Sequence, residues 1–170
     1  LESISKKAGF SFSTDLLPWR RCLREISSES EYALTPVVTW NEEWSKTNYY
    51  TRPIAYWQGL YFYRKEQYPS GPKITKASDL NKFRLCGRVE YNYVMYGVPE
   101  DNIECVSKSI ENLVLRLLAD RCDLFLARDA NASGEALLFG KPSPFENPKI
   151  GYKVVPGMEK NAFYLMINKR

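Results

Sequence analysis

The stretch from Lys73 to Asp129 alternates short apolar runs with helical patterns, and this alternation constrains the fold more than any other feature of the chain. The apolar runs predict strands over 83–87, 102–106 and 122–126. Ser109 is the expected N-cap of a helix between the last two strands, because apolar residues recur at helical spacing from Ile110 to Leu118. Alternating strands and helices predict an α/β fold with a mainly parallel sheet flanked by helices.

The ends of two predicted strands indicate where a ligand site would lie. Ligands of parallel sheets bind outside the carboxyl ends of the strands. The segments that follow such ends are Gly87–Tyr93 and Ala127–Asp129, so we expect them to meet at one site. Asn92 is the expected N-cap of a second helical segment, whose first backbone amides would attract anions.

The rest of the chain predicts a second series of strands and helices around the first. The expected elements are a helix ending by residue 8, strands over 10–13, 32–38 and 59–63, helices over 15–26 and 133–139, and strands over 152–155 and 162–167. One strand leaves the first half near Tyr63 and another leads back, which is the layout of a hinged clamp with a cleft. We therefore expect lobe I over 1–63, lobe II over 64–162 and a returning strand over 163–170.

Composition excludes several kinds of site. The 170 residues include no histidine, which removes the commonest general base and the commonest metal ligand. The cysteines at 22, 86, 105 and 122 lack Cys-x-x-Cys spacing, so we expect no zinc, no other metal and no cofactor. These cysteines are either buried free thiols or include a disulfide, and the sequence leaves both open.

The charge pattern and hydropathy also limit the partners. The net charge of +4 is spread along the chain, and the one tight basic group, at Arg20, Arg21 and Arg24, lies on a predicted amphipathic helix. A solvated helix face accounts for it, so we expect no nucleic acid as a partner. No run approaches the roughly 20 apolar residues of a membrane span, and no signal peptide is visible at the start.

Several segments together resemble a known family. They are Pro18-Trp19 with Leu23, Ala33 to Thr39, Tyr50-Thr51-Arg52-Pro53, Leu60 to Lys65, Ile74 to Leu80 with Arg84 to Gly87, Leu117 to Asp123, and Gly151 to Asn168. In their order and spacing they resemble bacterial periplasmic solute-binding proteins of extracellular family 3, which serve polar amino-acid ABC transporters. The resemblance covers almost the whole chain and implies a two-lobed, type II periplasmic-binding fold.

The resemblance also implies a function. It implies capture of a small polar, amino-acid-like solute between the lobes, delivery to a membrane permease, a periplasmic or extracellular location and a monomer. The family's first strand should precede Leu1 and its closing helices should follow Arg170, so the resemblance implies a chain trimmed at both ends.

The same comparison suggests the residues of the ligand site. By matched position or by neighbouring chemistry, the candidates are Trp19, Thr39, Trp40, Trp57, Arg88, Tyr91, Asn92, Tyr93, Arg128 and Asp129. The family's carboxylate-binding arginine is matched by Trp44 here, and aromatic rings crowd this region. Asp129 could bind a ligand's amino group and Arg128 an acid, or the two could form an exposed salt-bridged pair.

Two other functions fit the same scaffold. A sensory input domain of a membrane receptor would have the same two lobes and would bind its ligand in the same way. A dehydratase-like enzyme would need a buried carboxylic acid in the cleft, for which Glu90 and Asp129 are the candidates. Because no nucleophile–base pair is visible, we expect a binding protein without catalytic residues.

Overall fold

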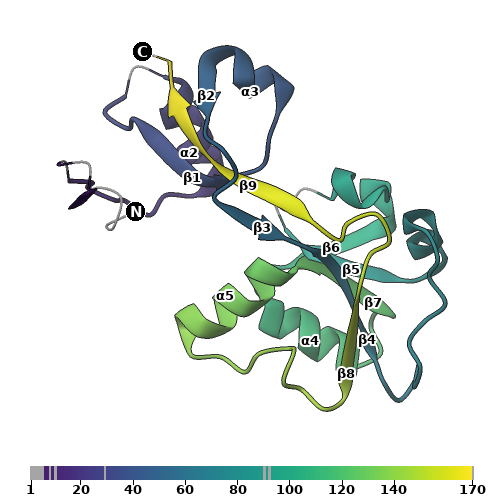
Figure 1. Ribbon diagram of the computed structural model, residues 1–170. Helices are drawn as coiled ribbons and strands as arrows, with labels where there is room; N and C mark the ends of the chain where they lie inside the picture. Colours follow the sequence, from purple (N-terminus) through teal and green to yellow (C-terminus); the bar gives the residue numbers. More distant parts are fainter. Residues whose placement is uncertain are drawn as a thin grey trace. The chain divides into compact units, whose positions relative to one another are not determined.

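The computed structural model describes residues 6–7, 9, 11–28, 30–89, 91 and 93–169. The chain forms two compact units (Figure 1). Unit 1 comprises residues 1–55 and 163–170, and unit 2 comprises residues 56–162. The chain passes from unit 1 to unit 2 within strand β3 (Ala55–Trp57) and returns within β9 (Asn161–Asn168).

Unit 2 is built on a five-stranded sheet in the order β6-β5-β7-β4-β8. Strand β5 (Leu85–Arg88) lies between β6 (Ile103–Ser107) and β7 (Leu124–Arg128) and runs parallel to both. Strand β4 (Gly59–Arg64) runs antiparallel to β7 and to the edge strand β8 (Ile150–Val154). The parallel arrangement predicted for the three strands between 83 and 128 is therefore confirmed.

Helix α4 (Ile110–Leu118) forms for the reasons that the sequence predicts. The side chain of Ser109 accepts a hydrogen bond from the backbone N–H of Asn112 at 3.2 Å, which caps the first turn. Ile110, Leu113 and Leu117 are the buried residues of the helix, so its apolar stripe faces the sheet.

The other helical segments of unit 2 are α5 (Asp129–Phe139) and three 3-10 turns, η1 (Ala77–Lys82), η2 (Val94–Tyr96) and η3 (Glu100–Asn102). Helix α5 begins four residues before its predicted start and ends at Gly140, whose φ of 60° suits glycine. The helical segment expected after Asn92 is only the single turn η2, and Asn92 itself lies outside the described residues.

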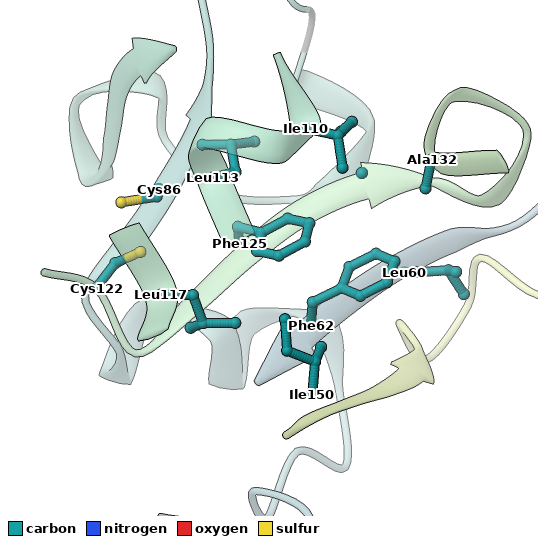
Figure 2. Close-up of a cluster of buried hydrophobic side chains, with 11 residues drawn as sticks. Leu60, Phe62, Cys86, Ile110, Leu113, Leu117, Cys122, Phe125, Ala132 and Ile150 are labelled. Atoms are coloured by element: carbon teal, nitrogen blue, oxygen red, sulfur yellow. The ribbon is translucent and has the colours of Figure 1, made fainter. Parts of the chain in front are cut away.

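The core of unit 2 is packed between α4, α5 and the sheet. The rings of Phe62 on β4 and Phe125 on β7 stack with centroids 4.4 Å apart and planes 5° from parallel (Figure 2). The buried residues of this cluster are Leu60, Phe62, Cys86, Ile110, Leu113, Leu117, Cys122, Phe125, Ala127, Ala132 and Ile150. The face of the β4–β7 pair that carries Phe62 and Phe125 thus depends on side chains that are more than 60 residues apart in sequence.

All four cysteines are free thiols, so the disulfide alternative is not realised in this structure. Cys86 and Cys122 are buried side by side in the unit 2 core (Figure 2). A hydrogen bond with the Cys122 thiol, assisted by Arg116, lowers the pKa of Cys86 to about 7, while the same contact and burial raise the pKa of Cys122.

Unit 1 has a smaller sheet in which β9 lies between β1 (Leu34–Val38) and β2 (Asn48–Tyr50). Both neighbours run antiparallel to β9, so the expectation of a mainly parallel sheet is wrong for this unit. The physical reason is that β9, the returning strand, takes the central position and runs opposite to both. Unit 1 also contains helices α2 (Trp19–Ser27) and α3 (Glu42–Thr47).

Other expectations also differ from the structure. Strand β4, which we placed in lobe I, belongs to unit 2 because it pairs with β7 and β8, and the chain therefore crosses at 55–56 rather than at 63–64. Residues 11–13 form no strand, and Phe10 and most of the predicted first helix lie outside the described residues. No helix in the described part of the chain is long and apolar enough to cross a membrane.

A buried carboxylate stabilises η1, the turn that precedes the parallel strand β5. Asp79, only 5% exposed, accepts hydrogen bonds from the backbone N–H groups of Thr75 (2.9 Å) and Lys76 (3.1 Å) and from the Thr75 hydroxyl. Lys82 Nζ lies 2.7 Å from its other oxygen. The ion pair with Lys82, followed by the bonds from Thr75 and Lys76, holds the pKa of Asp79 well below its ordinary value.

We expect Asp79→Asn to lower the melting temperature at pH 7, because the neutral amide loses the charge-assisted bonds. Because the pKa of Asp79 is lower in the folded protein than in the unfolded chain, its ionised carboxylate stabilises the fold at pH values above the unfolded pKa of roughly 3.9. This stabilisation is lost as the pH falls through the pKa of the folded state. In thermal unfolding, the difference in melting temperature between the native protein and Asp79→Asn should therefore become smaller below about pH 4. Asp101→Asn, an exposed control, should match the native protein. A difference that stays constant from pH 7 to pH 2 would contradict this role.

Candidate functional site

The candidate site in unit 2 lies at the carboxyl ends of two neighbouring strands. Arg88 ends β5 and Arg128 ends β7, and because these strands pair in parallel their ends share one edge of the sheet. Tyr91 and Tyr93 lie in the loop after β5, and their ring centroids are 4.8 Å apart. The structure thus brings Arg88, Tyr91, Tyr93 and Arg128 to the edge where parallel sheets bind ligands.

Arg128 lies close to two aromatic rings. Its guanidinium carbon lies 4.4 Å from the centroid of the Trp57 ring and 5.2 Å from that of Tyr91. Trp57 is only 1% exposed, so the first ring is fixed in the protein interior. One guanidinium nitrogen, Nη2, also lies 3.5 Å from the sulfur of Met95. Two cation–π contacts and partial burial therefore fix the orientation of this charge. We call Arg128, Trp57 and Tyr91 the arginine clamp.

Tyr91 is the outer ring of this clamp. Its hydroxyl donates a long hydrogen bond of 3.4 Å to the side-chain oxygen of Asn131 on α5. Burial is the main cause that raises the pKa of its hydroxyl, with the positive charge of Arg128 opposing. Tyr91 therefore stays a neutral donor at physiological pH. Asn131 and Met95 were not predicted as site residues, because nothing in their local sequence indicates contact with this edge.

Tyr93 is buried and its hydroxyl is used by the protein itself. The backbone N–H of Arg88 donates to the Tyr93 hydroxyl oxygen at 2.6 Å. A Cβ on Gly87 would lie 2.7 Å from the same oxygen and 2.7 Å from Ile103 Cγ2, so only glycine allows this approach. Burial raises the pKa of Tyr93 well above its ordinary range. The contact fixes the end of β5.

Arg88 links three elements through its guanidinium group. It forms an ion pair with Glu135 of α5 (Nη1 to Oε2, 3.2 Å) and donates to the backbone oxygen of Lys108 at 2.9 Å. The other oxygen of Glu135 accepts a 2.6 Å hydrogen bond from the backbone N–H of Ile110, at the start of α4. Glu135, in the middle of α5, therefore ties this helix and the start of α4 to the end of β5.

Asp129 stabilises the junction between β7 and α5. Its Oδ1 accepts hydrogen bonds from the backbone N–H of Gln58 at 2.9 Å and from that of Ala130 at 2.7 Å. Its own backbone N–H donates to the carbonyl oxygen of Gln58 at 3.0 Å. These bonds extend the β4–β7 pairing by one residue and explain why α5 begins here rather than at Ser133.

The candidates in unit 1 follow β1 or begin α2. Trp19 is 44% exposed, Trp40 is 57% exposed and Thr39 is half-buried. Val37 has a φ of 62°, which is rare for a β-branched residue, and the β1–β9 register shifts between Thr35 and Val38. This strained bulge directs the chain into the Thr39–Trp40 turn, and the sequence gives no sign of it.

Trp44, at the position of the family's arginine, packs against the unit 1 core formed by Ile26, Val38 and Met166. Its backbone N–H donates to the side chain of Asn41, which caps α3. Asn92, together with the alternative acid Glu90, lies outside the described residues.

A groove of about 380 Å³ lies elsewhere in unit 2, between β6 and α4. Its lining residues are Val106, Ser107, Asn112, Leu115, Arg116, Ala119 and Arg121. None of the predicted site residues lines it, so the groove does not bear on the arginine clamp.

We expect Asp129→Ala to lower the free energy of unfolding by about 1–2 kcal/mol, because two backbone donors lose their acceptor. Asp129→Asn keeps a side-chain oxygen in this place and should retain most of the stability. Urea unfolding of both variants beside the exposed control Asp101→Ala measures the difference. An equal loss of unfolding free energy in the alanine and asparagine variants would contradict this role, because only asparagine keeps an acceptor oxygen for the two backbone N–H groups.

Comparison with known proteins gives a clear structural likeness. No family model matches the sequence, and no curated protein matches it either. Among solved structures, the chain is similar to the arginine-, lysine-, histidine-binding protein ArtJ of Geobacillus stearothermophilus, with 13% identity and a TM-score of 0.66. That match covers 99% of this chain and 70% of the other.

Two further structures agree with the first. The substrate-binding protein AbpA of an amino acid ABC transporter from Streptococcus pneumoniae, solved with L-arginine, has 15% identity and a TM-score of 0.68 over 99% of this chain and 68% of its own. ArgBP of T. maritima has 14% identity and a TM-score of 0.66 over 99% and 70%. At such identities the likeness establishes the fold: the chain has the α/β, two-lobed periplasmic-binding fold of amino-acid ABC-transporter substrate-binding proteins.

Proposed function

We propose that this chain is a substrate-binding protein that captures a small polar, amino-acid-like solute for an ABC transporter. The observation that carries the proposal is the match of 99% of the chain to substrate-binding proteins, at TM-scores of 0.64 to 0.68. The division into two units crossed by β3 and β9 supports it, because two-crossing clamps close around ligands. Binding then works by higher affinity for the closed state.

The chemistry of the strand ends also supports a binding role. In the arginine clamp, the guanidinium group of Arg128 lies over the rings of Trp57 and Tyr91 at the carboxyl end of β7. Asp129 accepts a hydrogen bond from the backbone, and Glu135 binds a backbone N–H and Arg88. Both carboxylates therefore stabilise the structure around the site. These features serve recognition rather than proton transfer, so we propose a binding protein and not an enzyme.

The same proposal covers the partner and the location. A membrane permease would receive the closed, ligand-loaded protein in the periplasm or outside the cell. The protein would act as a monomer with one ligand. For the ligand contacts from unit 1 we propose Trp19, Thr39 and Trp40, which are exposed or half-buried in the described structure.

Thermal unfolding against a ligand panel tests the proposed function. The panel contains amino acids, organic acids, polyamines and small peptides. A ligand at 100 times its dissociation constant should add about 2.7 kcal/mol of stability, which raises the melting temperature by several degrees. As a control, the shift must keep growing with the logarithm of ligand concentration above the dissociation constant. A panel in which no compound raises the melting temperature would contradict the proposal.

A further inference from the structure

We propose that Cys86 and Cys122 are a redox pair that closes into a disulfide bond in an oxidising environment. In the structure both carry free thiols. The inference goes beyond the solute-binding function and rests on contacts within unit 2 alone. Its supports are the position of the two thiols in the core and the arginine beside one of them.

The position of the two cysteines is the first support. Cys86 lies on β5, and Cys122 lies two residues before β7, the parallel neighbour of β5. The backbone N–H of Asp123 donates to the carbonyl oxygen of Arg84 at 2.8 Å, which binds the chain beside Cys122 to the chain just before β5. Both side chains point into the same core cluster, where Figure 2 shows their sulfur atoms next to each other. The pair therefore needs little movement to bond.

Burial makes this contact persistent. Cys86 is 0% exposed and Cys122 is 1% exposed, and the Cys122 thiol donates a hydrogen bond to the sulfur of Cys86. Side chains in a close-packed core keep their neighbours, so each thiol meets the other far more often than any thiol outside the protein. The other two cysteines differ, because Cys105 is exposed and Cys22 is half-buried, and neither belongs to this cluster.

The charge of Arg116 is the second support. Arg116 lies on α4, and its Nη2 is 2.8 Å from Oε1 of Glu104, the β6 residue that pairs with Cys86 in the sheet. This ion pair holds the guanidinium group near Cys86. The hydrogen bond from Cys122, with help from Arg116, lowers the pKa of Cys86 to about 7, below the usual value of roughly 8.5. Because the thiolate is the attacking species, Cys86 is the nucleophile of the pair.

Oxidised glutathione, a small disulfide, is a sufficient oxidant. The Cys86 thiolate attacks one of its sulfur atoms, the glutathione S–S bond breaks, and one glutathione thiolate leaves. The Cys122 thiol then loses its proton and attacks the sulfur of Cys86, and the second glutathione thiolate leaves. The two cysteines lose two protons and two electrons, which convert one glutathione disulfide into two thiols. Because both cysteines are buried, the exchange takes place as unit 2 folds or opens locally.

The bond would close the chain from residue 86 to residue 122 into a loop that contains β6 and α4. A cross-link stabilises a protein mainly because it restricts the unfolded chain. The oxidised protein should therefore melt at a higher temperature than the reduced protein, by roughly 5–15 °C for a loop of this length.

Peptide mapping of the full chain tests the pairing. The protein is refolded with oxidised glutathione, alkylated with iodoacetamide, digested with trypsin without reductant and analysed by mass spectrometry. Trypsin cleaves after lysine and arginine, so each cysteine lies in its own peptide, namely 22–24, 85–88, 89–108 and 122–128. We expect peptides 85–88 and 122–128 as one species, with their summed mass less two hydrogens, which dithiothreitol separates. Recovery of both as separate alkylated peptides, or either joined to Cys22 or Cys105, would overturn the proposal.

Variants connect the bond to stability. The double variant Cys22→Ser, Cys105→Ser keeps the pair, so dithiothreitol should lower the melting temperature of its oxidised form. The same protein with Cys122→Ala is the matched control and should not respond to the reductant. If this control fails to fold, the peptide map of the native chain still decides. A melting temperature of the double variant that is equal with and without dithiothreitol counts against the bond. Neither measurement needs a ligand, so the outcome is independent of the solute-binding proposal.

Discussion

The pairing of β7 with β5 on one side and β4 on the other is the interaction on which the rest of unit 2 depends. It brings Phe125 onto Phe62 in a stacked pair at the centre of the core. It also sets the ends of β5 and β7 beside each other, so that Arg88 and Arg128 share one edge. A slip of one residue in this register would turn Phe125 away from the core and Arg128 away from Trp57.

The same pairing explains why the site is rigid. Asp129 continues the β4–β7 pairing to Gln58, and Gln58 directly follows Trp57, the inner ring of the clamp. Glu135 connects α5 to the end of β5 through Arg88. The hydroxyl of Tyr93 fixes the backbone where β5 ends. These contacts hold the carboxyl ends of β5 and β7 in place, at the edge of the sheet where we propose that a ligand binds.

The sequence predicted the local features of this fold and missed the distant ones. The N-cap Ser109 and the apolar stripe of α4 depend on residues within two turns of each other, so their pattern is visible. The partner of β4 could not be predicted, because it is set by contacts with β7 more than 60 residues away. Arg128, Trp57 and Tyr91 were each candidates, yet the clamp depends on a contact across 71 residues. The start of α5 was missed because a distant backbone N–H, that of Gln58, binds Asp129.

The central claim is that the chain is a substrate-binding protein whose unit 2 binds a small solute at the carboxyl ends of β5 and β7. The most direct test is a crystal structure of the protein grown with the compound that raises its melting temperature most. The account predicts that the bound compound lies at these strand ends, in contact with side chains of the loop after β5 or of the β7–α5 junction. A compound bound elsewhere, such as in the groove between β6 and α4, would contradict it.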